Sequence, residues 1–407
     1  MDDGALHGLR GWLVDRGLAG DGELELLEGF CERCNAAGLV LARGLALIDT
    51  LHPVYEGRVF SWGRDIPPET PVAQYGPSSE GEGLEQWRQS PFYTLLESGA
   101  DEMRRRLWQG ENRDFPVLAD LSRQGDTDYL AMIQRFSPER AIGEMDCFIS
   151  RWTTDRQGGF LDDEVAALRE LVPLLGLAVK SASLRRVAES LVETYLGRDA
   201  GQRVLQGKMS RGVVEKINAA LWFSDMRGYT TLSETIASDQ LIPLLDDYAE
   251  AVITAIHGAG GDVLKLIGDG ILAIFTADSA AEACSCALRA EAELRGLLAT
   301  LNARRAAEER PTTLVYLGLH IGDVFYGNIG SRERLDFTVV GQAVNEVARI
   351  ASLCRSVDRN ALVSSEFSAA LPEEDRRRLV SVGRYALRGV RRAQDLYTVD
   401  IEMPDAG

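Results

Sequence analysis

Apolar and polar positions change their spacing several times along the first 90 residues. Residues 1 to about 37 carry leucines and a phenylalanine on one mixed face, which predicts helical structure. Two apolar runs follow, at 38–48 and 55–62, and their length and composition predict strands. The stretch 67–83 is rich in Pro, Gly and Ser, which is typical of a loop.

The next 70 residues predict one helix and three strands. The helix is expected to run from Ser90 to Trp108, because serine caps a helix start and Pro91 suits the first helical position. The strand candidates are 115–121, 128–136 and 145–153. Strands with a helix inserted among them and a long helix after them predict one α+β module, with an antiparallel sheet covered on one side.

From residue 161 the pattern becomes helical until Gly197. Apolar residues step by three and four positions in a heptad-like stripe made of Leu168, Leu171, Leu175, Ala178 and Ala182. A stripe this short fits either the core face of an ordinary helix or a parallel two-chain connector, and both interpretations stay open. The polar, glycine-punctuated stretch 201–216 predicts a domain boundary.

The stretch 261–275, GDVLKLIGDGILAIF, predicts a hairpin, because two apolar runs flank an Asp-Gly pair. Asp269 then lies at the turn. Lys265 precedes it by four residues, so the two side chains are expected on one face of the hairpin. A plain surface turn with a solvated lysine is the alternative for this stretch alone.

A second carboxylate has a similar placement. Residues 218–224 predict a short buried strand, and Asp225 falls at its end, where ligands of α/β sheets gather. Thr231 and Glu234 have the spacing of a capping box for a helix running toward His257. A strand, a carboxylate, a glycine-bearing turn and a helix start form a phosphate-binding arrangement, and the carboxylate would bring a divalent cation. Together with Asp269, it predicts a two-metal phosphoryl-transfer site.

Residues 316–349 predict a second hairpin around Gly322-Asp323, a strand over 332–341 and a helix from Gln342. Asn345 and Arg349 are four residues apart and therefore share a helix face. An arginine there can hold a phosphate oxygen and an asparagine can hold a ribose, although two polar residues on a solvated helix are the ordinary alternative.

Composition narrows the class of protein. The chain has 407 residues, 45% of them hydrophobic, with 44 basic against 62 acidic residues and a formal net charge of -18. This balance argues against a nucleic-acid binder, which needs a concentrated basic face. No apolar run of membrane-spanning length and no signal-peptide pattern occurs, so we expect a cytoplasmic protein with no membrane partner. The six cysteines complete no zinc set and are expected to be buried or idle thiols.

Several strings occur in the order of a known family, the class III nucleotidyl cyclases. They are WFSDMRGYT, KLIGDGILAIF, LGLHIGDVFYGNIGS and LDFTVVGQAVNEVARI, and the resemblance covers about residues 219–399. It implies a ferredoxin-like βαββαβ catalytic domain with an antiparallel sheet. It also implies a homodimer whose metal residues and base or transition-state residues lie on opposite sides of composite active sites.

The resemblance assigns roles residue by residue. Asp225, Asp269 and the carbonyl of Met226 correspond to the ligands of two cations, Mg²⁺ or Mn²⁺. Asn345 and Arg349 match the ribose-orienting and transition-state residues. The substrate-binding positions are Lys265 and Thr338 for the base, the turn residues Arg227, Gly228, Tyr229 and Thr230 for the triphosphate, and Arg388, which stands near the family's phosphate-binding lysine.

Base recognition follows from hydrogen-bond chemistry. Lys265 can donate to N1 of adenine while Thr338 accepts from its amino group, so ATP is the expected substrate and cyclic AMP the product. A threonine hydroxyl also donates, which leaves a cyclase for GTP or a pyrimidine nucleotide as an alternative. A catalytically inactive nucleotide-binding regulator is another. A diguanylate-type cyclase is disfavoured because the GG[DE]EF hairpin is absent from the sequence.

The layout of the first 160 residues resembles a GAF-type sensor domain, which implies a regulatory input from an unidentified small molecule or protein. The expected organisation is therefore a GAF-like α+β regulatory domain at 1–160, a helical, coiled-coil dimerising linker at 161–215 and the catalytic domain at 216–400.

Overall fold

The computed structural model describes the chain except for residues 65, 67–70, 77–80, 138, 140–141, 144, 209, 211, 389, 391–392 and 401–407. Its backbone separates into two compact units, Met1–Leu191 and Val192–Gly407. We describe each unit by itself. The division at 160 and 215 expected from the sequence stays a prediction.

The N-terminal unit is built on a six-stranded antiparallel sheet in the order β3-β2-β1-β6-β5-β4. The helices expected before residue 37 are confirmed as α1 (Asp3–Ala19) and α2 (Glu23–Ala36). The strands are β1 (Arg43–Asp49), β2 (Gly57–Gly63), β3 (Val72–Tyr75), β4 (Glu102–Arg105), β5 (Asp128–Arg135) and β6 (Cys147–Thr154). β3 falls in the predicted loop, where it pairs with β2 at the edge of the sheet.

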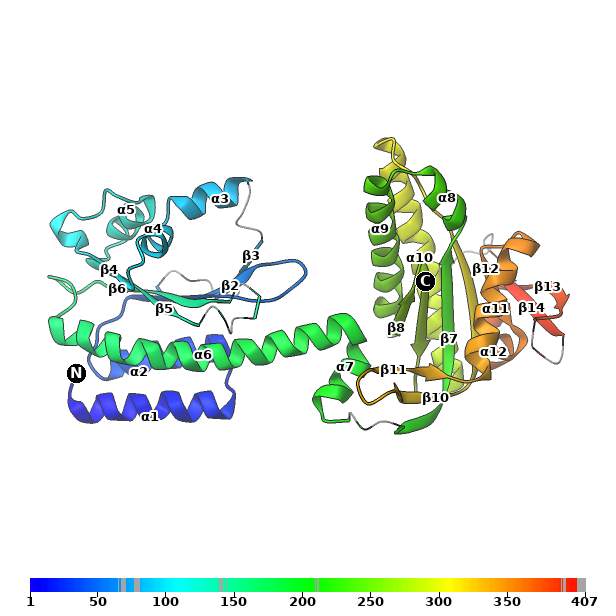
Figure 1. Cartoon of the computed structure of the whole chain (residues 1–407), viewed down its shortest axis with the longest axis horizontal. Helices are drawn as coiled ribbons and strands as arrows, with labels where there is room; N and C mark the ends of the chain where they lie inside the picture. Colours follow the sequence, from blue (N-terminus) through cyan, green and yellow to red (C-terminus); the bar gives the residue numbers. More distant parts are fainter. Residues whose placement is uncertain are drawn as a thin grey trace. The chain divides into compact units, whose positions relative to one another are not determined.

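Helices cover both faces of this sheet, so the prediction of a single covered side was wrong. One face packs against α1, α2 and α6 (Asp162–Leu196). The other packs against shorter elements: α3 (Gly81–Arg88), α4 (Pro91–Glu97) and α5 (Pro116–Arg123), which Figure 1 shows, and the 3-10 turn η1 (Leu107–Gln109). Burial on both faces explains why β5 reads as a nearly continuous apolar run.

Two predicted elements were wrong here. The helix that begins at Ser90 has the expected cap, because the Ser90 hydroxyl accepts from the amide of Tyr93, but it ends at Glu97, and Gly99 follows with a φ of +69°. The expected strand at 115–121 is helix α5. Pro116 occupies its first turn, and Leu118 and Leu121, three residues apart, fill the core.

The heptad-like stripe of α6 is a core face of the N-terminal unit. Leu168, Leu171 and Leu175 are each 0% exposed in a single chain, packed with α1, α2 and the sheet. These positions cannot also form the seam of a two-chain coiled coil. The sheet supplies the apolar partner surface that the sequence pattern alone left undetermined.

The C-terminal unit contains a mixed sheet in the order β13-β14-β12-β10-β7-β9-β8, with β11 paired to β10. Its elements are α7 (Arg198–Leu205), β7 (Val214–Met226), α8 (Tyr229–Thr235), α9 (Ser238–Gly258), β8 (Asp262–Ile267), β9 (Gly270–Phe275), α10 (Ala280–Ala307), β10 (Val315–Gly330), β11 (Leu335–Val340), α11 (Gln342–Val357), β12 (Ala361–Ser364), α12 (Ser365–Ala370), α13 (Glu373–Arg376), β13 (Leu379–Tyr385) and β14 (Gln394–Val399). The β7-α9-β8-β9-α10-β10 portion has the expected βαββαβ order. The sheet is not wholly antiparallel, because β12 runs parallel to β10.

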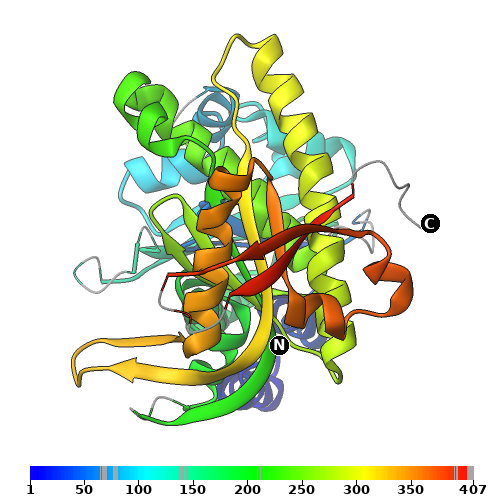
Figure 2. The same ribbon diagram turned by 90° about the vertical axis from the view of Figure 1, so that its right-hand side faces the viewer.

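Helices lie on opposite faces of this sheet, as Figure 2 shows for α10 in yellow and α11 in orange. The core with α9 and α10 includes Trp222, Leu244 and Phe275, whereas the core with α7 and α11 includes Leu221, Tyr326 and Val347. Alternate residues of β7 thus serve the two faces, as strand geometry requires.

The predicted hairpin around Gly322-Asp323 does not exist, because β10 is one continuous strand through these residues. Gly322 and Asp323 pair with Ala219 and Asn218 of β7. Glycine is needed here for helix packing rather than for a turn. A Cβ at Gly322 would lie 2.8 Å from the Cβ of Ala343 on α11, so the small residue lets the helix approach the strand.

Every helix in the described part of the chain is too short or too polar to span a bilayer.

Candidate active site

Two carboxylates meet at the end of β7. Asp225 is the penultimate residue of this strand, and its neighbour Ser224 is paired with Ile271 at the start of β9. The β8-β9 hairpin turns tightly at Gly268, whose φ of +65° favours glycine, and this turn carries Asp269. The amide of Met226 donates to Oδ2 of Asp269 at 3.1 Å. The predicted convergence of Asp225 and Asp269 is therefore present in the structure.

The two acids influence each other strongly. Partial burial, followed by the hydrogen bond and the negative charge of Asp269, raises the pKa of Asp225 to about 7. Two carboxylates and the nearby carbonyl of Met226 offer hard oxygen donors, which suit Mg²⁺ or Mn²⁺. A third acidic, histidine or cysteine ligand is absent among the described residues. The donor set therefore fits divalent cations that share ligands with a bound phosphate.

The turn after Met226 leads into helix α8. Gly228 has a φ of +76° and Tyr229 begins the helix, so the first amides of α8, including that of Thr230, have no intrahelical partner. The guanidinium of Arg227, in the same turn, contacts Asn360 at 3.4 Å and Asp358 at 3.7 Å.

The predicted capping box in this region was wrong. Thr231 and Glu234 both lie inside α8, which starts two residues before Thr231 without a side-chain cap. The helix ends at Thr235, because Ile236 adopts an extended conformation, and α9 begins at Ser238. The single helix expected to run toward His257 is thus two helices.

One candidate base-binding residue, Lys265, contacts the strand that carries the other, Thr338. Lys265 follows a β-bulge in β8, and its ammonium forms an ion pair with Asp336 of β11. Thr338 stands two residues further along β11, so its side chain and that of Asp336 share a face of the strand. Asp336 was not among the predicted site residues, although its parity with Thr338 was a usable signal.

Asn345 and Arg349 lie one turn apart on the exposed face of α11, and within the described residues neither side chain has a hydrogen-bond or ion-pair partner. The inner face of the helix is anchored by Glu346. Its carboxylate accepts from Gln342 at 2.7 Å and from Gln394 at 3.0 Å, and it lies 3.4 Å from His320. These contacts fix the helix that carries the two candidate residues.

The remaining predicted residue, Arg388, is exposed in the connection between β13 and β14, and no bond in the described part of the chain links it to the other candidates. Likewise, no hydrogen bond or ion pair between described residues joins the carboxylates Asp225 and Asp269 to Asn345 or Arg349. One chain therefore presents a pair of carboxylates and, with no direct bond to them in the described part, a pair of polar side chains on α11.

Comparison with known proteins identifies the family of the C-terminal part of the chain. Residues 213–400 match the family model of the Adenylate and Guanylate cyclase catalytic domain. This part of the chain is a class III cyclase catalytic domain.

Particular relatives can be named. An adenylate cyclase from Anabaena cylindrica is 29% identical over 228 residues, covering 54% of this chain and 45% of that protein. Adenylate cyclase 1 from Rhizobium meliloti (strain 1021) is 26% identical over 182 residues, covering 44% of this chain and 26% of its own length. The crystal structure of the adenylyl cyclase CyaB from P. aeruginosa is 24% identical, with a TM-score of 0.43 over 48% of this chain and 100% of that chain. The chain thus spans less than half the length of the two curated relatives.

Proposed function

We propose that this protein is an adenylate cyclase, which converts ATP to 3′,5′-cyclic AMP and pyrophosphate. The observation that carries the proposal is the meeting of Asp225 and Asp269 beside the helix start at Tyr229, within the matched catalytic domain. The relatives named adenylate cyclase support the same reaction.

Asp225, Asp269 and the carbonyl of Met226 would hold two divalent cations, Mg²⁺ or Mn²⁺. Such cations lower the pKa of an attacking hydroxyl and neutralise charge on a triphosphate. The free amides of Gly228, Tyr229 and Thr230 bind the triphosphate through the helix start. Arg227 is held away by Asn360 and Asp358 in the substrate-free chain, and it must leave these partners to touch a phosphate.

The residues of α11 act on the reacting part of the nucleotide. Asn345 orients the ribose so that its 3′-hydroxyl faces the α-phosphorus. Arg349 donates to the α-phosphate oxygens as negative charge accumulates there, and a contact of this kind contributes about 3 kcal/mol of transition-state stabilisation. The exposed, unpartnered state of both side chains in the described part of the chain leaves them available for this task.

Lys265 and Thr338 select the base. Asp336 holds the ammonium of Lys265 beside β11 before the nucleotide arrives, and Lys265 then donates to N1 of adenine while Thr338 accepts from its amino group. The hydroxyl of Thr338 can also donate to a guanine carbonyl. Conversion of GTP is therefore the second candidate function.

The separation between the carboxylate pair and the α11 pair supports a homodimer with two composite sites, each using metal ligands of one chain and Asn345 and Arg349 of the other. The N-terminal unit would regulate these sites as a sensor. The GAF-like character of that unit and the identity of its regulator belong to the same proposal.

The proposal is tested by incubating the purified full chain with each of the four ribonucleoside triphosphates in Mg²⁺ or Mn²⁺ and identifying products by mass. We expect cyclic AMP and pyrophosphate from ATP as the main products. Cyclic GMP as the main product would show that GTP, rather than ATP, is the substrate. The absence of any cyclic product, together with retained nucleotide binding, would leave the inactive regulator as the better description.

A further inference from the structure

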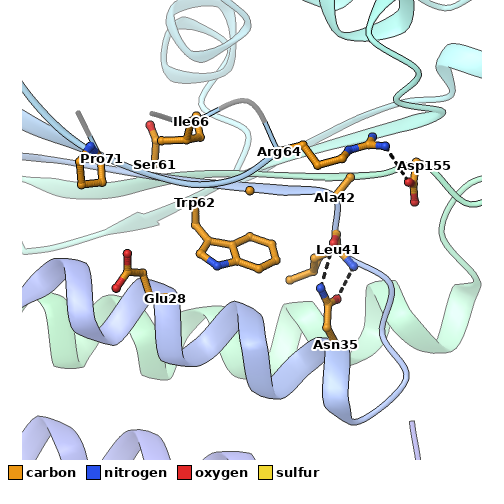
Figure 3. A pocket seen from close by; sticks show the side chains of 11 residues that line it. Glu28, Asn35, Leu41, Ala42, Ser61, Trp62, Arg64, Ile66, Pro71 and Asp155 are labelled. Atoms are coloured by element: carbon orange, nitrogen blue, oxygen red, sulfur yellow. Dashed lines mark hydrogen bonds and ion pairs between the residues drawn. The ribbon is translucent and has the colours of Figure 1, made fainter. Parts of the chain in front are cut away.

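Two hollows adjoin strand β2 in the N-terminal unit, and their polar groups differ. The larger hollow, about 610 Å³, lies beside α2 and is lined in part by Asn35, Trp62 and Arg64 (Figure 3). Its central polar groups are engaged. Asn35 exchanges hydrogen bonds with the backbone of Leu41 at 3.0 and 2.6 Å, and Arg64 lies 3.0 Å from Asp155.

The smaller hollow, about 230 Å³, is formed between the sheet and α5. The sheet contributes Arg43, Ser61 and Arg151, and α5 contributes Val117, Asp120 and Leu121, followed by Gln124 just after the helix. The carboxylate of Asp120 is paired with Arg123 of the same helix. Figure 3 shows Ser61 pointing away from Trp62 and from helix α2, toward the opposite side of the sheet. This hollow therefore combines two basic side chains on its floor with a helix wall in which Val117 and Leu121 are apolar and Asp120 is paired with a neighbouring arginine.

Buried polar atoms without partners gather on this face of the sheet. Arg43, Thr153 and Tyr129 stand opposite one another across β1, β6 and β5, and Arg151 is the next residue of β6 on the same face. Three shielded atoms here have no hydrogen-bond partner within the described residues: Nε of Arg151, Oγ1 of Thr153 and Oη of Tyr129. Buried polar atoms in proteins are nearly always paired, and all three of these groups can donate.

The charges around the hollow also favour an anion. Nε of Arg43 donates to Asp126 at 2.9 Å, and Arg64 reaches the same carboxylate at 3.2 Å, so two arginines share Asp126. Arg151 has no carboxylate partner in the described part of the chain. Burial, with the neighbouring Arg43, lowers the pKa of the Arg151 guanidinium, and the opposing influence of Tyr129 and Asp126 does not outweigh it. A shielded positive charge of this kind is stabilised by an anion.

We propose that this hollow binds a small organic acid, whose carboxylate accepts from Arg151 and whose apolar body lies against Val117 and Leu121. Its volume of about 230 Å³ is below the range of about 300–1,000 Å³ that holds drug-sized ligands, which excludes a nucleotide and favours a short acid. Inorganic phosphate shares the oxyanion chemistry, but it leaves the apolar wall of α5 without a partner.

The experiment is a calorimetric titration of the purified full chain with butyrate, with butyramide as the neutral isostere and with inorganic phosphate. We expect butyrate to bind the wild type, and Arg151→Met to weaken it by about tenfold or more, because the charged hydrogen bonds to the carboxylate are lost. Arg135→Met is the matched control. Arg135 stands on β5 of the same sheet, half-exposed, and is paired with Asp101 at 3.2 Å. The Arg135→Met variant should bind butyrate as tightly as the wild type does.

Butyrate that fails to bind the wild type, or binds Arg151→Met equally well, overturns the proposal. Tighter binding of phosphate or of butyramide than of butyrate overturns the assignment to an organic acid. Should Arg151→Met fail to fold, Arg151→Lys tests the same lining position, because it keeps the charge but loses the planar fork of donors, and it should weaken butyrate. The readout is binding to the N-terminal unit, so its failure is independent of any failure of the cyclase assignment.

Discussion

At the scale of single residues, the cost of placing Asp225 beside Asp269 indicates what the pair is for. The raised pKa of Asp225 shows that its ionised form is unfavourable in the metal-free chain. A fold that needed only a stable strand end would be better served by a neutral residue there. The arrangement is favourable when cations neutralise both acids.

Neutralising either acid should therefore lower the cyclase activity without lowering the stability of the fold. We expect Asp225→Asn or Asp269→Asn to reduce the cyclase rate by on the order of 100- to 1,000-fold, since the remaining carboxylate binds cations weakly. The metal-free variants should unfold at the same temperature as the wild type or higher, because the repulsion is relieved. Product assays, Mn²⁺ titration followed by electron paramagnetic resonance, and thermal denaturation measure the three effects.

Asp323→Asn is the matched control for this pair. Asp323 lies on β10 of the same sheet, and its partners are Lys216 at 2.7 Å and Asn218 at 2.9 Å. Its loss should leave cyclase rate and Mn²⁺ affinity unchanged. An Asp269→Asn chain with wild-type turnover would contradict the assignment of the metal site.

Base selection is also decided by single side chains. Exchanging Lys265→Glu together with Thr338→Cys removes the donor to adenine N1 and supplies an acceptor for the N1 and amino protons of guanine. We expect the ratio of kcat/KM for GTP over ATP to rise by about 100-fold, which corresponds to one or two hydrogen bonds per base. Steady-state kinetics with both nucleotides provide the measurement. An unchanged ratio would show that other residues read the base.

At the scale of elements, the sequence predicted correctly those turns and strands whose conformation depends on neighbouring residues in the chain. The β8-β9 hairpin was predicted because Gly268 and Asp269 specify a tight turn between two apolar runs. The central strand β10 was misjudged as a hairpin because Gly322-Asp323 resembles a turn. The reason for that glycine is tertiary, namely the close approach of Ala343 on α11, which no sequence window contains.

The N-terminal unit shows the same limit. The stripe of Leu168, Leu171 and Leu175 was visible in the sequence, but its partner surface was not, and the sheet rather than a second chain buries it.

Asp336 was missed at the candidate site because its ion pair with Lys265 joins positions 71 residues apart. The candidate residues themselves were predicted from motifs, whereas their grouping into two sets required the fold.

The junction of α2, α6 and β2 depends on one buried acid. Glu23 is 2% exposed and accepts from Arg58 at 3.2 Å and from Arg186 at 3.1 Å. Burial alone raises the pKa of Glu23, but the hydrogen bond and charge of Arg186, with the charge of Arg58, outweigh it and lower the pKa. The ionised carboxylate therefore stabilises the packing of three elements.

Glu23→Gln should lower the free energy of unfolding of the N-terminal unit by about 3 kcal/mol at pH 7, because two arginines lose their buried partner. The folded pKa lies below the unfolded value of about 4.5, so the stabilisation is present above that pH and is lost as pH falls through the folded pKa. Urea denaturation of both proteins at pH 7 and near pH 3, followed by tryptophan fluorescence, measures this. Glu32→Gln, on the exposed face of α2, is the control, and a difference independent of pH would contradict the role of ionisation.

At the scale of the whole molecule, a single chain holds every candidate residue but distributes them in two groups. Asp225 and Asp269 lie at the end of β7, while Asn345 and Arg349 lie on the exposed face of α11. In the proposed homodimer, a complete site requires two chains in which each group faces the opposite group of its partner. Such an arrangement makes catalysis dependent on protein concentration, because dissociation separates the metal ligands from the arginine.

Complementation between two inactive chains tests this arrangement directly. Asp225→Ala and Arg349→Ala chains should each be inactive alone, but an equal mixture should recover about a quarter of wild-type activity, since half of the dimers are mixed and each mixed dimer has one intact site of two. The matched control mixes Asp225→Ala with Asp269→Ala. Both changes then fall on the metal-binding side, so both sites of a mixed dimer are damaged and no activity should return. No recovery in the first mixture, despite chain exchange shown by differently tagged subunits, would mean that each chain builds its site alone. Recovery in the control would mean that Asp225 and Asp269 of one site come from different chains.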